Sequence, residues 1–254
     1  LTEKEINLFP LSGISNVETI HCNENGYFSV YKSDRYGFNN LDKNHDEQII
    51  DYVFIGDSFV QGACVNFNNT FTYLVEKRLN KKIINFAMDG NGPLINYAAL
   101  KEFFPQNSTV KNVVYFYTEK NDLEDLLLEN ENNILKRYLE DENYSQNLLD
   151  KVDLVNSILK VKISSSIEKF KLQNNSFLNF ITLYNIRTFV MPFFYIGGDI
   201  SIKKSVDNEE ILETFQNIVL EMKNFSVSKK SNFFLIYLPS FEKLALNKDN
   251  TWKY

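Results

Sequence analysis

The stretch Asp51-Tyr-Val-Phe-Ile-Gly-Asp-Ser-Phe-Val-Gln-Gly62 decides how this chain folds. The apolar run Tyr52–Ile55 is typical of a short buried strand, and it stops abruptly at Gly56-Asp57-Ser58, where a helical pattern begins. A tight turn after a strand exposes its side chains, and the helix that follows directs its N-terminal N–H groups toward the same place. The stretch therefore predicts a strand, a turn and a helix that together present the Ser58 hydroxyl.

The same alternation of strands and helices continues to residue 117. The sequence predicts helices over Thr70–Leu79 and Leu94–Phe104, and strands over Lys82–Phe86 and Val113–Tyr117. Units of about thirty residues in this order favour parallel strands joined by right-handed crossovers. We therefore expect an α/β fold with a flavodoxin-like parallel sheet and helices on both faces.

The rest of the chain has a different character. Residues 1–49 read as an irregular N-terminal extension, and residues 50–254 as the α/β domain. Residues 123–230 lack a comparable strand and carry helical stripes, the clearest at Glu209–Phe225 and another at Phe177–Phe189. Because ordinary crossovers are much shorter, this region is interpreted as a helical insertion. A fourth strand is expected at Phe233–Leu238.

Composition excludes several classes of protein. The formal net charge of −6 argues against nonspecific nucleic-acid binding, which requires a cationic face. No run reaches the ~18 apolar residues of a membrane span. Cys22 and Cys64 are too few for a disulfide framework or a zinc site, and His21 and His45 are too few for a His-rich metal site. We expect two ordinary half-buried thiols rather than a disulfide, and no metal or cofactor.

Polar residues follow three of the expected strands. They are the Ser58 turn, the segment Asn85-Phe-Ala-Met-Asp-Gly-Asn-Gly-Pro93, and Thr118-Glu-Lys-Asn-Asp122. In open parallel sheets, sites form at the carboxyl ends of the strands, so the three should converge. Together they offer a hydroxyl, a glycine-rich turn with backbone N–H groups, and a carboxamide. This is the inventory of acyl transfer, which needs a nucleophile and donors for an oxyanion.

Each of these residues also has a purely structural interpretation. Ser58 and Asn121 could cap the helices that follow them, and Gly90 could simply serve a turn. Asp57 is interpreted as a hydrogen-bonded brace of its turn rather than as a catalytic group. For the acidic residues near the third segment, we favour a solvated face over a cation site; they are Glu119, Glu124, Asp125, Glu129 and Glu131.

The three segments, in this order, resemble the signature blocks of the SGNH/GDSL hydrolase family. Gly56-Asp57-Ser58 resembles the first block, and the resemblance implies that Ser58 is the nucleophile. It implies that the N–H groups of Ser58 and Gly90 and the side chain of Asn121 form the oxyanion hole, with Asp57 in support. The resemblance covers residues 50–122 and, more weakly, the strand at 233–238. It also implies a three-layer sandwich.

The chain departs from the family pattern in two places. Glu119 stands where the third block usually has glycine, which places an acid near the oxyanion hole. The family takes its base from a late Asp-x-x-His, but no histidine follows His45, and we expect neither His21 nor His45 to reach Ser58. Either the C-terminal part of the domain is missing or the protein is a pseudoenzyme. The start at Leu1 and the end soon after the fourth strand favour a fragment.

The resemblance implies an SGNH-type serine esterase or O-acyltransferase that forms a seryl ester intermediate. Its substrates would be small-molecule or glycan acyl esters, since Asp34-Arg-Tyr-Gly-Phe38 is similar to a segment of SGNH domains that modify bacterial surface polysaccharides. The family also points to a periplasmic or extracellular location, although the residues themselves leave the compartment open. The alternative is an inactive SGNH-like module that binds a glycan or a protein partner.

Overall fold

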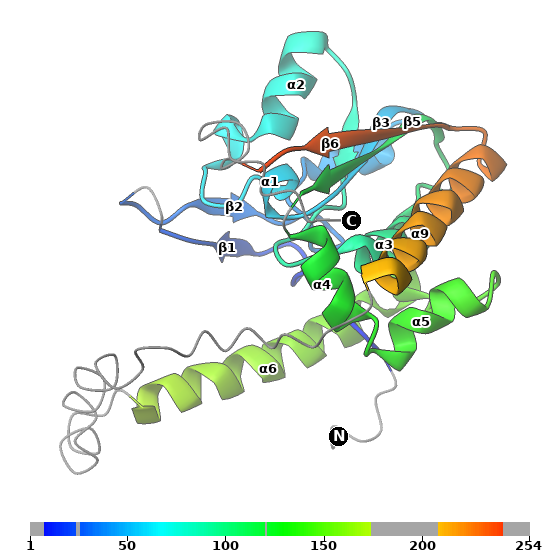
Figure 1. Cartoon of the computed structure of the whole chain (residues 1–254). Helices are drawn as coiled ribbons and strands as arrows, with labels where there is room; N and C mark the ends of the chain where they lie inside the picture. The colour runs from blue at the N-terminus through cyan, green and yellow to red at the C-terminus, as the bar shows by residue number, and fades with distance from the viewer. Residues whose placement is uncertain (1–7, 24–25, 120, 174–207, 241–254) are drawn as a thin grey trace.

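The computed structural model describes residues 8–23, 26–119, 121–173 and 208–240 (Figure 1). Its central sheet has the order β4-β3-β5-β6, and all three neighbouring pairs are parallel. The strands are β3 (Ile49–Ile55), β4 (Ile83–Asn85), β5 (Thr109–Thr118) and β6 (Asn232–Leu238). The α/β class and the flavodoxin-like three-layer arrangement predicted from the alternating pattern are confirmed.

Helices cover both faces of this sheet (Figure 1). One face packs against α3 (Pro93–Phe103) and α9 (Asn208–Ser228), and Val53, Leu100 and Met222 lie fully buried in this layer. The other face carries a smaller cluster around Phe54 and Phe116, covered in part by α2 (Phe71–Leu79). Strands buried on both faces explain why the sequence of β3 is apolar without alternation.

The described part of the segment between β5 and β6 consists of helices joined by loops. It contains α4 (Asp122–Glu129), α5 (Asn133–Glu140), a 3-10 turn at Leu148–Lys151, α6 (Val152–Gln173) and α9. The helix expected over Phe177–Phe189 lies outside the described residues. Among the described helices, none is both long and apolar enough to cross a membrane.

The N-terminal segment is more ordered than its sequence suggests. A short hairpin pairs β1 (Glu18–Ile20) with β2 (Val30–Lys32), and the buried carboxylate of Asp34 organises the turn that follows. Asp34 accepts hydrogen bonds from the backbone N–H groups of Tyr36 and Phe38 and from Asn40 Nδ2. A 3-10 turn at Asp42–Asp46 then leads into β3. The Asp34 network fixes the path of the chain before the sheet begins.

The expectation of two free thiols is wrong, because Cys22 and Cys64 form a disulfide with Cα atoms 5.0 Å apart. Cys22 follows β1, and Cys64 lies in the loop between α1 (Ser58–Gln61) and a 3-10 turn at Phe67–Asn69. The hairpin folds back over that loop, so residues 42 positions apart in sequence meet. The bond ties the N-terminal hairpin to the segment that carries Ser58.

Candidate functional site

The turn after β3 places Ser58 at the carboxyl end of a central strand. Asp57 is the N-cap of α1, and its side chain accepts a hydrogen bond of 3.0 Å from the Phe59 N–H. Ser58 is therefore the first residue inside the helix and not its cap. Its side chain is half-buried, whereas the neighbouring Asp57 is 1% exposed. The hydroxyl of Ser58 therefore does not cap α1, contrary to the structural interpretation of this residue.

Asp57 connects the first segment to the third. Its Oδ2 lies 3.3 Å from Asn121 Nδ2, which donates a hydrogen bond to it. Burial raises the pKa of Asp57, and hydrogen bonds from the Phe59 N–H and from Asn121 Nδ2 partly offset this rise. As the sequence suggested, Asp57 is a hydrogen-bonded brace of the turn.

The carboxamide of Asn121 does not cap the helix that it precedes. Asn121 occupies the N-cap position of α4 but makes no side-chain cap hydrogen bond there. Its Nδ2 group has two hydrogens, and the contact with Asp57 uses one of them. A second donor therefore remains at the turn that carries Ser58.

The second segment is hydrogen-bonded to the first. The backbone N–H of Asp89 donates to Gln61 Oε1 at 2.8 Å, and Asn85 Nδ2 donates to the Val60 carbonyl at 2.7 Å. Gly90 lies in this turn with a φ of 76°, a conformation that favours glycine. A Cβ atom built on Gly90 would meet nothing within 4 Å, so there is open space beside its backbone. The three polar segments thus converge, as the strand order predicted.

Several acidic residues of α4 belong to the frame of this site. Glu129 is 5% exposed and accepts hydrogen bonds from the N–H groups of Gly92 and Leu94 at the start of α3. Burial raises the pKa of Glu129 to about 8. The interpretation of this residue as part of a solvated face is wrong, because its carboxylate caps another helix. Asp125 is half-buried, and burial, followed by the charge of Asp57, raises its pKa to about 6.

Asp122 is the most deeply buried acid of the group. Its Oδ2 accepts a hydrogen bond of 2.6 Å from Tyr115 Oη and a second from the Thr118 N–H. Burial raises the pKa of Asp122 to about 7, and the nearby charge of Asp57 adds to the rise. Glu119, by contrast, is bound to the end of the neighbouring strand, since its Oε2 accepts from the Ser240 N–H at 2.9 Å. Its carboxylate is thus engaged with the segment after β6.

The two histidines are held by different carboxylates. His45 Nε2 lies 2.8 Å from Asp34 Oδ2, and both side chains are buried in the N-terminal segment. His21 Nε2 lies 3.7 Å from Asp89 Oδ2, which places its imidazole beside the turn of Gly90. That neither histidine serves Ser58 stays a prediction.

Sequence reasoning missed the polar residues that join the segments. Asn40 exchanges two hydrogen bonds with the backbone of Asn85 at the end of β4, and Asn39 Nδ2 donates to the carbonyl of Gln61. The sequence offered one sign of these contacts, which is that asparagines stand next to apolar runs. An asparagine buried there needs hydrogen-bond partners for its amide. Protein-family models, curated proteins and solved structures were all compared with this chain, and none gave a significant match.

Proposed function

We propose that this chain is an SGNH-type serine esterase or O-acyltransferase domain that acts on ester-linked acyl groups, such as those of surface polysaccharides. The observation that carries the proposal is the hydrogen bond from Asn121 Nδ2 to Asp57 Oδ2. It brings the carboxamide predicted for the oxyanion hole to the turn of the predicted nucleophile, across 64 positions of sequence. A carboxamide that merely capped α4 would have no reason to make this contact.

In the proposed reaction, Ser58 Oγ attacks the acyl carbonyl and the ester oxygen leaves with a proton. The N–H groups of Ser58 and Gly90 and the remaining hydrogen of Asn121 Nδ2 stabilise the oxyanion. The resulting seryl ester then passes its acyl group to water or to a sugar hydroxyl. We assign the proton of Ser58 to a histidine from outside this sequence, because His21 and His45 both lie in the N-terminal segment and no histidine follows His45.

A serine hydroxyl without a base is a weak nucleophile, so the 254-residue chain should hydrolyse p-nitrophenyl acetate slowly. Free imidazole can supply the absent base. We expect imidazole to increase hydrolysis by the unmodified chain more than by the Ser58→Ala variant, and mass spectrometry to find an acetyl group on Ser58. Ser165→Ala, an exposed site on α6, is the matched control.

Equal hydrolysis by the unmodified and Ser58→Ala proteins at every imidazole concentration, with no acetyl group on Ser58, would refute acyl transfer. In that case the same three segments would be better explained as a binding module. Circular dichroism of Ser58→Ala guards against a trivial loss of structure. We expect its spectrum to be unchanged, because the half-buried hydroxyl of Ser58 does not cap α1.

A further inference from the structure

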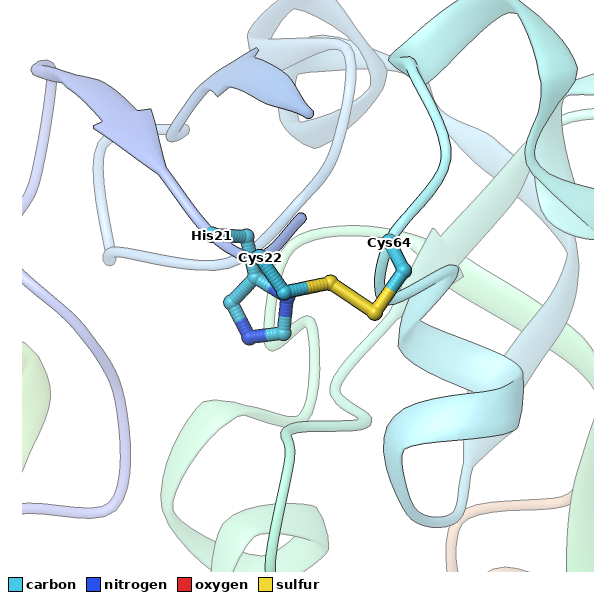
Figure 2. Close-up of side chains that lie close together, drawn as sticks. All are labelled: His21, Cys22 and Cys64. Carbon is cyan, nitrogen blue, oxygen red and sulfur yellow. A yellow bond between two sulfur atoms is a disulfide. The ribbon is translucent and has the colours of Figure 1, made fainter. Parts of the chain in front are cut away.

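A second group of reactive side chains lies outside the acyl-transfer residues. His21, Cys22 and Cys64 each offer one ligand atom, and these three atoms lie within 4.8 Å of one another. Figure 2 shows the imidazole of His21 beside the bond between the two sulfurs. Two of the residues are consecutive at the end of β1, and the third comes from the loop after α1. All three side chains are half-buried.

The two nitrogens of His21 have different surroundings. Nε2 faces Asp89 Oδ2 at 3.7 Å, whereas Nδ1 is buried and has no hydrogen-bond partner among the described residues. A proton on Nε2 would be attracted to the Asp89 carboxylate, which leaves the lone pair of Nδ1 available. Metal-binding histidines commonly have this arrangement, with one nitrogen on the metal and the other directed at a carboxylate.

The backbone holds this histidine in place. The His21 N–H donates to the carbonyl of Ser29, and the Ser29 N–H donates to the carbonyl of Cys22. These two hydrogen bonds extend the β1–β2 hairpin past its last paired residue. The backbones of His21 and Cys22 are thus fixed relative to each other before any ligand binds.

We propose that reduction of the Cys22–Cys64 disulfide creates a site for a thiophilic divalent metal ion such as Zn²⁺. The ligands are Nδ1 of His21 and the two thiolates, with the fourth position open to water, and Asp89 orients the imidazole. Zinc binding needs Zn–S bonds of about 2.3 Å and a Zn–N bond of about 2.0–2.1 Å. The three ligand atoms are close enough for such bonds once the two sulfurs of the reduced cysteines move apart. The disulfide and the metal therefore exclude each other.

An external phosphine reduces the disulfide. The phosphine gives up two electrons and becomes a phosphine oxide, the S–S bond breaks, and water supplies the oxygen of the oxide and the two protons of the thiols. The metal ion then displaces both thiol protons as the two Zn–S bonds form. None of these steps involves Ser58. The test of the metal site is therefore independent of the test of the proposed acyl transfer.

The test uses the full chain reduced with a phosphine under argon and titrated with Co²⁺, which reports tetrahedral thiolate coordination by its visible and charge-transfer absorption. We expect one equivalent to bind, Zn²⁺ to displace it, and the oxidised protein to give no such spectrum. His21→Ala should weaken binding at least tenfold, and Asp89→Asn by about 10–100-fold. Asp150→Asn, at an exposed site in the turn before α6, should bind as tightly as the unmodified chain.

Two results would overturn the proposal. One is a reduced chain that shows no tetrahedral Co²⁺ spectrum. The other is equal affinity of the unmodified, His21→Ala and Asp89→Asn proteins for Co²⁺, which would mean that the two thiolates bind the metal without the imidazole. Because these two variants leave both cysteines in place, the answer does not depend on whether a double serine variant folds. Circular dichroism of each reduced protein shows whether the unmodified chain and the variants are equally folded when their metal affinities are compared.

Discussion

The carboxylate of Glu129 on α4 accepts a hydrogen bond of 2.6 Å from the backbone N–H of Gly92, the residue that precedes α3. Its second oxygen accepts from the Leu94 N–H at 2.8 Å. The first N–H groups of any helix lack partners within the helix, so a side chain from elsewhere must satisfy them. Here the helical insertion supplies that side chain to α3, a helix that packs on one face of the central sheet.

Glu129→Ala should therefore destabilise the protein. Two buried N–H groups would lose their acceptor, and each buried donor without a partner costs about 1–3 kcal/mol. Urea unfolding at pH 9, above the pKa of about 8 at which Glu129 ionises, measures the loss. The matched control is Glu124→Ala, an exposed acid on the same helix, which we expect to change stability by less than about 0.5 kcal/mol. Equal effects of the two substitutions would show that the cap is unimportant.

Asp122 predicts a specific dependence of stability on pH. Its pKa in the folded protein is about 7, above the ordinary value of 3.8. The stabilisation linked to this proton is fully present below about pH 3.8 and is lost as the pH rises through 7. Between these limits, the free energy of unfolding of the unmodified protein should fall, relative to Asp122→Asn, by up to about 1.4 kcal/mol per pH unit. A constant difference from pH 4 to 8 would contradict the prediction.

The disulfide should contribute to stability because it restricts the unfolded chain. For cysteines 42 residues apart, loss of the cross-link is expected to cost about 2–4 kcal/mol. Replacing both Cys22 and Cys64 by serine should lower the urea midpoint by the corresponding amount. A phosphine should do the same to the unmodified protein and leave the double variant unchanged. Urea unfolding measures the effect of the double substitution and the effect of the phosphine. A chelator is present in both experiments so that metal ions do not interfere.

Two glycines with positive φ provide a matched pair of substitutions. Gly37 has a φ of 97°, and a Cβ atom there would lie 2.0 Å from the carbonyl oxygen of Gly13. Gly90 has a φ of 76° with nothing within 4 Å of such an atom. Gly90→Ala should cost about 1–2 kcal/mol from backbone strain alone, whereas Gly37→Ala must also displace a backbone segment. Thermal unfolding should therefore show a much larger effect at Gly37.

The sheet could be predicted because its strands are encoded locally. Each apolar run lies in an observed strand, although β3 begins at Ile49 rather than Tyr52 and β5 at Thr109 rather than Val113. The order of strands and helices selects parallel pairing. The meeting of the three polar segments at one edge of the sheet follows from the same rule. The β1–β2 hairpin was harder to predict, since strands of three residues leave too short a pattern to recognise.

Contacts between distant segments could not be predicted in this way. A count of two cysteines and two histidines argued against both a disulfide and a zinc site, but it gives no information on which residues meet. His21 and Cys64 are brought together by the path of the hairpin, which depends on the Asp34 network and not on local periodicity. In the same way, Glu129 looks solvated in sequence because its partners lie on another helix.

The pairing of β5 with β6 has a consequence for how the protein folds. β3, β4 and β5 follow one another along the chain with short crossovers, whereas β5 ends at Thr118 and β6 begins at Asn232. Closing a loop of that length costs chain entropy before its contacts repay it, so β6 should join the sheet last. Insertion of the helical region therefore sets the order of assembly. Refolding would proceed through an intermediate with three strands whose edge at β5 is briefly open to pairing with other chains.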